Sequence, residues 1–297
     1  MTALSTTARL LKAVYRFRRQ RDLARALGLP IPFRRRRKAA LVARLQRNWP
    51  GGYAVSVAGD LVFLPQPLEF QALRILFGGP GAHPAALGFL PAGGIALDIG
   101  ANLGEWTLPL AKAAGAEGRV LAFEPNPAIA QALGRSLRIN NLVQAAVVEV
   151  ALSDRDGTAE LRPDRENSGA TRLAAAAEGG KTVTVRTCRL DRLAAEAGLG
   201  RLDLVKIDVE GHERRVLEGA MVTLDRFHPA LVLESAHESA EDRAAIADLL
   251  ARLGYAPAAA LCDGGALPAS LDDYRARRGA CAGSEAHDLL WLPRRRA

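Results

Sequence analysis

An acid and two glycines directly follow an apolar run near the middle of the chain. The segment reads Asp98-Ile99-Gly100-Ala101-Asn102-Leu103-Gly104, and glycines at a strand-to-helix turn let the backbone approach a ligand closely. Dinucleotide-binding turns instead use the spacing G-x-G-x-x-G to seat a pyrophosphate. The carboxylate of Asp98 suits a cofactor that is positively charged there, as S-adenosylmethionine is at its ammonium and sulfonium. Taken alone, the segment also fits a tight turn with a capping aspartate.

A second acid ends the next apolar run, in Phe123-Glu124-Pro125. Glu124 follows Gly104 by twenty positions, the spacing at which doubly wound nucleoside sites place an acid that accepts both ribose hydroxyl groups. The alternative is an exposed acid that caps a helix before the proline. Because the two segments occur in register, together they favour a cofactor that contains a nucleoside.

Charged side chains interrupt a third apolar run, Leu204 to Glu210. Burying an ion costs several kcal/mol unless it is paired, so structure alone gives little reason for these residues. Lys206 and Asp208 are two positions apart and therefore share one face of a strand, near the edge where ligands bind in this architecture. We predict that Lys206, Asp208 and Glu210 are catalytic. The alternative is an internal ion pair, with Glu210 as a first-turn helix charge.

The apolar run at 230–233 also ends in an acid, Glu234, and His237 follows closely. Asp208 and Glu234 at neighbouring strand ends could hold a divalent cation through oxygen ligands. Two carboxylates are too few to predict a metal, so we predict no metal site. Glu234 and His237 are instead predicted to contact the substrate.

Short apolar runs alternate with helical periods beyond residue 90, as in βαβ units around a parallel sheet. The fold class predicted is α/β, with a doubly wound, mostly parallel sheet. The predicted strands are 95–99, 119–123, 146–150, 202–207 and 230–233, and the predicted helices are 106–114, 128–140, 212–224 and 240–253. Two further pieces, 158–161 and 182–187, predict an antiparallel excursion or an active-site cover. The runs 256–262 and 287–292 could close the sheet as an antiparallel pair.

Positive charge is concentrated in the first fifty residues, which hold fourteen Lys or Arg and one acid, Asp22, in a chain of net charge +8. Their pattern predicts a basic amphipathic helix at 8–27 and a short helix at 39–47. A hairpin at 53–64 and a helix at 68–77 follow. We therefore predict a basic N-terminal region, 1–90, on the substrate side of a larger domain, 91–297.

Composition limits the classes of protein to which the chain could belong. Hydrophobic residues make up 49% of the chain and charged residues 24%, which excludes a wholly disordered protein. No run of about 18 apolar residues occurs, and the N-terminus lacks the pattern of a secretory signal. These features predict a cytoplasmic protein.

Three blocks, in order along the chain, resemble the FkbM-type methyltransferase family. They are the segments Asp98 to Gly104, Phe123 to Pro125 and Lys206 to Gly211, and the resemblance covers roughly residues 60–235. It implies a class I methyltransferase (Rossmann-like) fold and S-adenosylmethionine as methyl donor. It also implies methylation of a hydroxyl group, usually on a sugar, glycan or other secondary metabolite.

The same resemblance implies roles for individual residues. The methionine side of the cofactor would be lined by Asp98, Gly100, Asn102 and Gly104. The ribose would lie at Glu124 and Pro125, and the adenine beside Ala151, Leu152, Ser153 and Asp154. Asp208 and Glu210 would face the reacting centre. The family fills the position of His212 variously, so no role is carried over to it, and the segment 168–171 only loosely matches a family element.

Two alternatives from other classes stay open. The basic segment could bind a phosphate backbone in an RNA methyltransferase, although it holds few aromatic residues for stacking on bases. A non-catalytic binding module could instead use the basic helix as a peripheral membrane anchor. A small-molecule or glycan hydroxyl acceptor is the favoured partner.

Overall fold

We describe the protein from a computed structural model, which covers residues 51–66, 69–77, 81–164, 167–173, 182–235, 238–262, 265–275 and 288–294. The helices expected at 8–27 and 39–47, and the substrate residue His237, lie outside these ranges. Within the part of the chain that the structure describes, no helix is long and apolar enough to cross a membrane.

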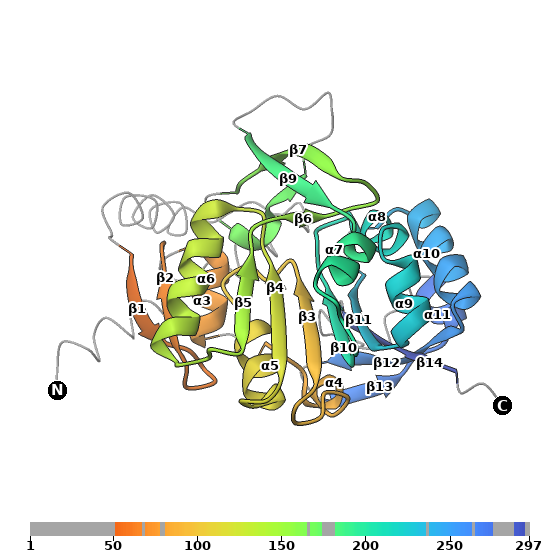
Figure 1. Ribbon diagram of the computed structural model, residues 1–297, viewed down its shortest axis with the longest axis horizontal. Coiled ribbons are helices and arrows are strands. Elements are labelled where there is room, and N and C mark those ends of the chain that lie inside the picture. Colours follow the sequence, from red (N-terminus) through yellow and green to blue (C-terminus); the bar gives the residue numbers. More distant parts are fainter. Residues whose placement is uncertain are drawn as a thin grey trace, which may run out of the picture.

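An eight-stranded sheet forms the centre of the molecule (Figure 1). Its strands, in order across the sheet, are β13 (Gly265–Pro268), β12 (Tyr255–Cys262), β14 (Asp288–Pro293), β11 (Ala230–Glu234), β10 (Leu204–Ile207), β3 (Ile95–Ile99), β4 (Arg119–Phe123) and β5 (Ala145–Val148). The five strands from β11 to β5 are mutually parallel, whereas β14 is antiparallel to both β11 and β12. The five predicted parallel strands and the closing antiparallel pair are thus all present.

Helices cover both faces of this sheet because side chains alternate along each strand. In β3, Leu97 and Ile99 join the core on one face, and Ala96 joins the core on the other. The first face packs on α7 (Leu190–Glu196), α8 (Glu213–Glu218), α9 (Met221–Phe227), α10 (Ala240–Arg252) and α11 (Leu271–Arg275). The second packs on α4 (Pro84–Leu87), α5 (Thr107–Ala114) and α6 (Pro127–Ile139). The predicted doubly wound fold of the class I methyltransferase type is confirmed.

The single helix predicted at 212–224 is wrong, because two short helices, α8 and α9, occupy this stretch. The break falls at Gly219, which ends α8. A Cβ atom there would lie 2.0 Å from the main-chain oxygen of Ser153. The sequence pattern of this stretch is helical throughout. The helix is interrupted because Gly219 packs closely against a loop from another part of the fold.

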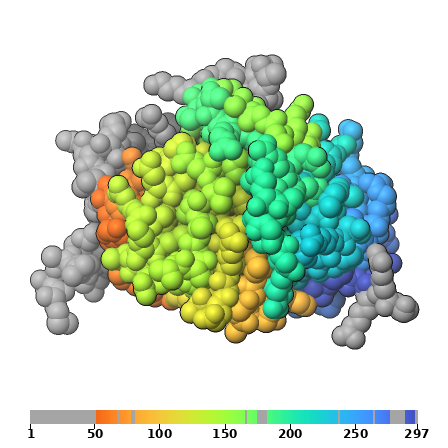
Figure 2. Space-filling view, viewed as in Figure 1, coloured from red at the N-terminus to blue at the C-terminus, as the bar shows by residue number. Residues whose placement is uncertain are grey.

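A smaller four-stranded sheet lies above the carboxyl ends of the parallel strands, at the top of the molecule (Figures 1 and 2). It contains β6 (Ala151–Leu152), β9 (Val183–Cys188), β7 (Gly157–Arg162) and β8 (Arg172–Leu173), and a short 3-10 helix, η1 (Ser168–Ala170), precedes β8. β7 pairs with β9 in antiparallel fashion. The antiparallel excursion predicted from 158–161 and 182–187 is confirmed.

The first described elements are the hairpin β1 (Gly52–Val55) and β2 (Leu61–Leu64) and the helix α3 (Phe70–Phe77). The predicted hairpin is confirmed, and it docks on α6. The main-chain N–H of Phe63 donates to Ser136 Oγ at 2.9 Å, and Asn140 both accepts from and donates to the main chain of Leu61. The hairpin and α3 thus pack on the larger domain, and a domain boundary near residue 90 stays a prediction.

Candidate functional site

A cavity of about 820 Å³ opens at the carboxyl ends of the parallel strands. Small-molecule sites in proteins commonly occupy roughly 300–1,000 Å³ and lie at this edge of doubly wound sheets. Its walls come from the loops after β3, β4, β10 and β11, the start of β14, the smaller sheet, and α3. Residues of β7, η1 and β8 also line the cavity, and the role of the smaller sheet as an active-site cover stays a prediction.

Asp98 lies at the floor of the cavity and is 2% exposed. It accepts a hydrogen bond from Thr107 Oγ1 at 2.5 Å, and it stands in register with Lys206 of the adjacent strand. Burial raises the pKa of Asp98 to about 7, although the Thr107 hydrogen bond and the Lys206 charge act in the opposite direction. A cationic ligand group would be attracted here, because it would stabilise the ionised form of this carboxyl group.

The glycine turn after β3 is held by main-chain contacts. The N–H groups of Gly100 and Ala101 both donate to the carbonyl oxygen of Phe123. Gly100 has a φ of 85°, and a Cβ atom on it would lie 1.8 Å from the carbonyl oxygen of Asp208. A glycine is therefore required, both by the conformation and by the contact with the end of β10.

Gly104 does not line the cavity, although the resemblance places it on the methionine side. Its φ is 94°, and a Cβ atom there would lie 2.4 Å from Leu108 and 2.5 Å from Leu133. The second glycine of the motif therefore permits helix packing beneath the turn.

Glu124 ends β4 with a carboxylate that is 7% exposed. One oxygen accepts the main-chain N–H of Asn102 at 2.9 Å, and the other accepts that of Asn126 at 2.8 Å. Burial raises the pKa of Glu124 to about 7 despite these two hydrogen bonds. Each carboxylate oxygen has a further lone pair, so the group can accept two more hydrogen bonds, as a ribose diol requires.

Lys206 is 1% exposed, and its ammonium has three neighbours. It pairs with Asp288, lies 3.6 Å from Asp208 Oδ2, and stands 5.4 Å from the centre of the Trp106 ring. Burial would lower its pKa, but the charges of Asp288 and Asp208 raise it above the ordinary value. The predicted pairing of Lys206 with Asp208 is present, and the lysine stays charged.

Two further carboxyl groups complete this end of the cavity. Glu210, with a φ of 55°, has its pKa raised to about 8 by burial and by the charges of Asp208 and Glu213. Burial, and then the charge of Asp208, raises the pKa of Glu234 still further. Both groups are therefore protonated more readily than an ordinary glutamate, and in the protonated form each can donate a hydrogen bond. Among the described residues, no cluster of His, Cys, Asp or Glu has the arrangement of a metal site.

The cavity brings together most of the residues predicted from the sequence. Those that line it are Asp98, Gly100, Asn102, Glu124, Pro125, Ala151, Leu152, Lys206, Asp208, Glu210 and Glu234. Ser153 and Asp154 lie outside the lining: Ser153 is buried behind it, and Asp154 receives a hydrogen bond from Arg215.

Several lining residues were missed by sequence reasoning. A buried lysine needs a carboxylate partner, so a partner for Lys206 could have been sought. Nothing in the sequence identifies Asp288, at the start of the last strand, as that partner. Arg74 and Gln71, on α3, donate to the two oxygens of Glu105 at 3.1 and 2.7 Å. Both belong to the region before residue 90, which we predicted on the substrate side, but no motif in the sequence singles out these two residues.

Ser168, in the segment that only loosely matches the family, also reaches the glycine turn. Its Oγ donates to Asn102 Oδ1 at 2.9 Å. Asn102 has a φ of 46°, a conformation that asparagine tolerates better than most residues. The smaller sheet is therefore connected directly to the turn whose glycine spacing first indicated a binding site.

Comparison with known proteins was made against family models, curated proteins and solved structures. The family model described as Methyltransferase FkbM domain matches residues 98–257, more than half of the chain. The match contains the glycine turn, Glu124 and the Lys206–Glu210 segment, and it ends within β12.

Curated relatives are about 30% identical to the chain within the aligned segment. The methyltransferase sdnD of Sordaria araneosa is 30% identical over an alignment of 173 residues that covers 48% of this chain and 65% of that protein. The 2-O-methyltransferase NoeI of Sinorhizobium fredii is 29% identical over an alignment of 147 residues that covers 44% of this chain and 59% of that protein. The chain thus spans less than two thirds of the length of these relatives. A solved FkbM methyltransferase from Methylobacillus flagellatus superposes with a TM-score of 0.45 at 17% identity, covering 76% of this chain and 54% of that one.

Proposed function

Because the chain belongs to the FkbM methyltransferase family, we propose that it transfers the methyl group of S-adenosylmethionine to a hydroxyl oxygen. The acceptor is a sugar, a glycan or another polyhydroxylated secondary metabolite. Two relatives support the reaction class through their names, the 2-O-methyltransferase NoeI and the 31-O-demethyl-FK506 methyltransferase of Streptomyces tacrolimicus.

One observation carries the proposal: a single cavity brings together two groups of residues, to which we assign a cofactor end and a separate acceptor end. At the cofactor end, Glu124 would accept the ribose hydroxyls, and Asp98 would attract the positively charged methionine portion. At the acceptor end, Lys206, Asp208, Glu210 and the other polar groups surround a space beside the Trp106 ring. The volume of about 820 Å³ is large enough for a nucleoside cofactor and a second small molecule together.

The acceptor end suits a molecule with many hydroxyl groups. Planar carboxyl and guanidinium groups form paired hydrogen bonds with neighbouring hydroxyls, and the Trp106 ring offers an apolar face. Residues Gln71 and Arg74 of α3 form part of this wall. The proposal therefore includes a role for the region before residue 90 as a substrate-side addition.

In the proposed reaction, S-adenosylmethionine supplies a methyl group that is activated by its sulfonium charge. The protein aligns the acceptor oxygen with that methyl carbon and excludes water. As the oxygen–carbon bond forms and the carbon–sulfur bond breaks, the hydroxyl proton passes to the carboxylate of Asp208. The Lys206 ammonium, 3.6 Å from this carboxylate, orients it, and Glu210 donates a hydrogen bond at the reacting centre.

Two measurements test the proposed function in sequence. Calorimetry with S-adenosylhomocysteine, the demethylated product, should show binding at one site. Incubation of the protein with methyl-labelled S-adenosylmethionine and an extract of the producing cell should then label a polyhydroxylated small molecule or glycan on oxygen. Label that enters RNA instead would overturn the acceptor class, and absence of binding would favour a non-catalytic module.

A further inference from the structure

The imidazole of His212 forms part of the cavity wall, and its other side contacts a polar network that runs from the buried Ser153 to the surface. His212 lines the cavity, whereas Ser153, its hydrogen-bond partner, lies behind the lining and is 4% exposed. Ser153 Oγ lies 2.9 Å from His212 Nε2. Nε2 is therefore close enough to form a hydrogen bond with a residue behind the cavity wall. The hydrogen-bonding role of the other ring nitrogen, Nδ1, depends on which atom carries the proton of that bond.

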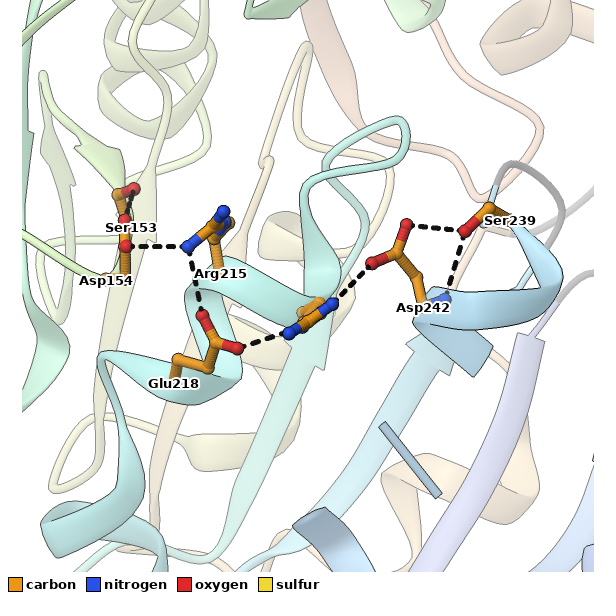
Figure 3. A network of polar contacts seen from close by, with 7 residues as sticks. Ser153, Asp154, Arg215, Glu218, Ser239 and Asp242 are labelled. Atoms are coloured by element: carbon orange, nitrogen blue, oxygen red, sulfur yellow. Dashed lines mark hydrogen bonds and ion pairs between the residues drawn. The ribbon is translucent and has the colours of Figure 1, made fainter. Parts of the chain in front are cut away.

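The network fixes the direction of each hydrogen bond, beginning at Asp154. Arg215 donates to Asp154 Oδ2 at 3.0 Å, and Arg155 lies 3.5 Å from Oδ1 (Figure 3 shows Asp154, Arg215 and Ser153). Burial acts to raise the pKa of Asp154, but the hydrogen bond from Ser153 and the two arginine charges outweigh it and lower this pKa. Asp154 is thus an ionised carboxylate and can only accept hydrogen bonds.

The hydroxyl proton of Ser153 must therefore point at Asp154 Oδ1, which lies 3.0 Å away. Its oxygen is left to accept the hydrogen bond from His212, so the proton of that bond is carried by Nε2. Burial lowers the pKa of His212, and the ring is neutral at pH 7. Because a neutral imidazole carries one N–H, Nδ1 presents a lone pair and acts as an acceptor.

The main chain around Ser153 holds this arrangement in place. The Ser153 N–H donates to the carbonyl oxygen of Cys188 at 3.0 Å. On the other side, the Ser153 carbonyl packs so closely against Gly219 that a Cβ atom there would lie 2.0 Å from it. The serine therefore cannot shift to release the ring without disturbing both contacts.

His212 lies at the end of the cavity where a nucleobase would sit in the proposed function. Ser153 directly follows Ala151 and Leu152, two apolar residues that line the cavity. The methyl-transfer end lies at Lys206, on β10, and at Asp208, which begins the loop that ends four residues later at His212. With the ribose at Glu124, the base extends toward the Ala151–Leu152 wall and meets His212.

Resting on the proposed function, we propose that His212 recognises the adenine of the cofactor, with Nδ1 accepting a hydrogen bond from the exocyclic amine. Adenine donates a proton at that position, whereas hypoxanthine carries an oxygen that can only accept. The neutral His212, held in one tautomer by Ser153, Asp154 and Arg215, would therefore distinguish an adenosyl from an inosyl cofactor. Asp154 and Arg215, at the surface, would therefore affect cofactor selectivity indirectly, because they hold His212 in this tautomer.

Calorimetry with two probes tests the inference: S-adenosylhomocysteine and S-inosylhomocysteine, its deaminated analogue. The wild-type protein should bind the adenosyl compound about tenfold more tightly than the inosyl compound. A difference of this size is expected when one hydrogen bond is lost and the acceptor Nδ1 is left without a donor. His212→Gln keeps a nitrogen that can donate to Ser153 but lacks an acceptor at the Nδ1 position, so this selectivity should disappear. His212→Asn places an oxygen near the Nδ1 position and should retain much of it.

Arg214→Gln provides the matched control in the same surface network. Arg214 contacts Glu218 and Asp242 but not Asp154, so its substitution should leave the selectivity unchanged. Full selectivity in His212→Gln, or equal loss in His212→Gln and His212→Asn, would overturn the inference while leaving the proposed function intact. Failure of the wild-type protein to bind either probe would overturn both.

Discussion

The two ends of the cavity are built in different ways. At the proposed cofactor end, Glu124 accepts main-chain N–H groups from two nearby residues of the loops after β3 and β4. At the proposed acceptor end, side chains from distant parts of the chain meet: Arg74 comes from α3, Lys206 from β10 and Asp288 from β14. The first end depends on backbone shape and the second on paired charges.

Because the two ends are built differently, they should tolerate substitutions differently. A site made of main-chain groups and one carboxylate binds one kind of molecule, because backbone geometry tolerates few substitutions. A site made of side chains on independent elements can change its acceptor by changing one partner at a time. Substitutions at the two ends should therefore affect cofactor binding and acceptor turnover separately. Four experiments test that separation, and a fifth tests the paired charges themselves.

The largest effect is expected for Asp208→Asn. Loss of the group that accepts the hydroxyl proton should lower turnover by about 10³-fold, within the usual range for general base catalysis. Affinity for S-adenosylhomocysteine should change less than about twofold, since the substitution lies at the acceptor end. Steady-state kinetics and calorimetry on the same preparation measure the two quantities. Full turnover in this variant would remove Asp208 from the proposed mechanism.

Glu124→Gln should have the opposite profile. The amide cannot accept both ribose hydroxyls as an ionised carboxylate does, so affinity for S-adenosylhomocysteine should fall by about 100-fold, the value of two charge-assisted hydrogen bonds. Turnover at saturating cofactor should fall far less. Glu196→Gln, a surface control whose residue pairs with Arg192, should leave binding unchanged. If Glu124→Gln instead bound normally, the ribose would have to lie elsewhere.

Asp288→Asn tests the ion pair that connects the last strand to β10. Leaving the buried Lys206 ammonium with one carboxylate fewer should lower the free energy of unfolding by about 2 kcal/mol, less than for a fully buried pair because Asp208 remains close. Urea denaturation measures the change. The double variant Lys206→Met/Asp288→Asn should recover part of the loss, because no charge is then left unpaired. Additive losses in the double variant would show that the two residues are not coupled.

The pH dependence of cofactor binding should report the buried carboxyl group at the cofactor end. In the free protein burial raises the pKa of Glu124 to about 7, and the ribose hydroxyls bind the ionised form. Protonation therefore competes with binding below pH 7, so affinity should rise with pH and level off above it. Between pH 6 and pH 8 the expected gain is about tenfold for this one group. Glu124→Gln should reduce this dependence, and an unchanged profile would assign it to Asp98.

Arg74→Ala should have the smallest effect. Arg74 contacts Glu105 at the cavity rim and is half exposed, so it contributes at most a few hydrogen bonds to the acceptor. The KM for the acceptor should rise about threefold with kcat nearly unchanged, as expected for loss of uniform binding. Cofactor affinity should not move. A fall in kcat instead would give this residue a part in aligning the acceptor oxygen.

The same difference explains how much could be predicted from the sequence. Strands β3 and β4 begin and end where the sequence places them, because their apolar runs are bounded by glycines and acids. Most of the residues predicted in those loops likewise line the cavity, since spacing within a short segment survives folding unchanged. Features that depend on local pattern alone were therefore predicted well.

The rest depends on tertiary packing. The Gly219 break and the Lys206–Asp288 pair both arise where segments far apart in sequence touch, and no local pattern encodes such a contact. Gly104 shows that a local motif can also mislead. It occupies a motif position, but it lies beneath the turn instead of in the cavity. The sequence predicted that this glycine lets the backbone approach a ligand, whereas the structure places Leu108 and Leu133 against it.

The absence of a side chain at Gly100 has a consequence for how the proposed activity could evolve. Since the turn after β3 rests directly on the carbonyl of Asp208, the loop that would hold the methyl donor and the loop that would supply the base cannot move independently. Under the proposed function, new acceptor specificity would therefore come from changes in the outer walls of the cavity, because the distance over which the methyl group is transferred would be set by two backbones in contact.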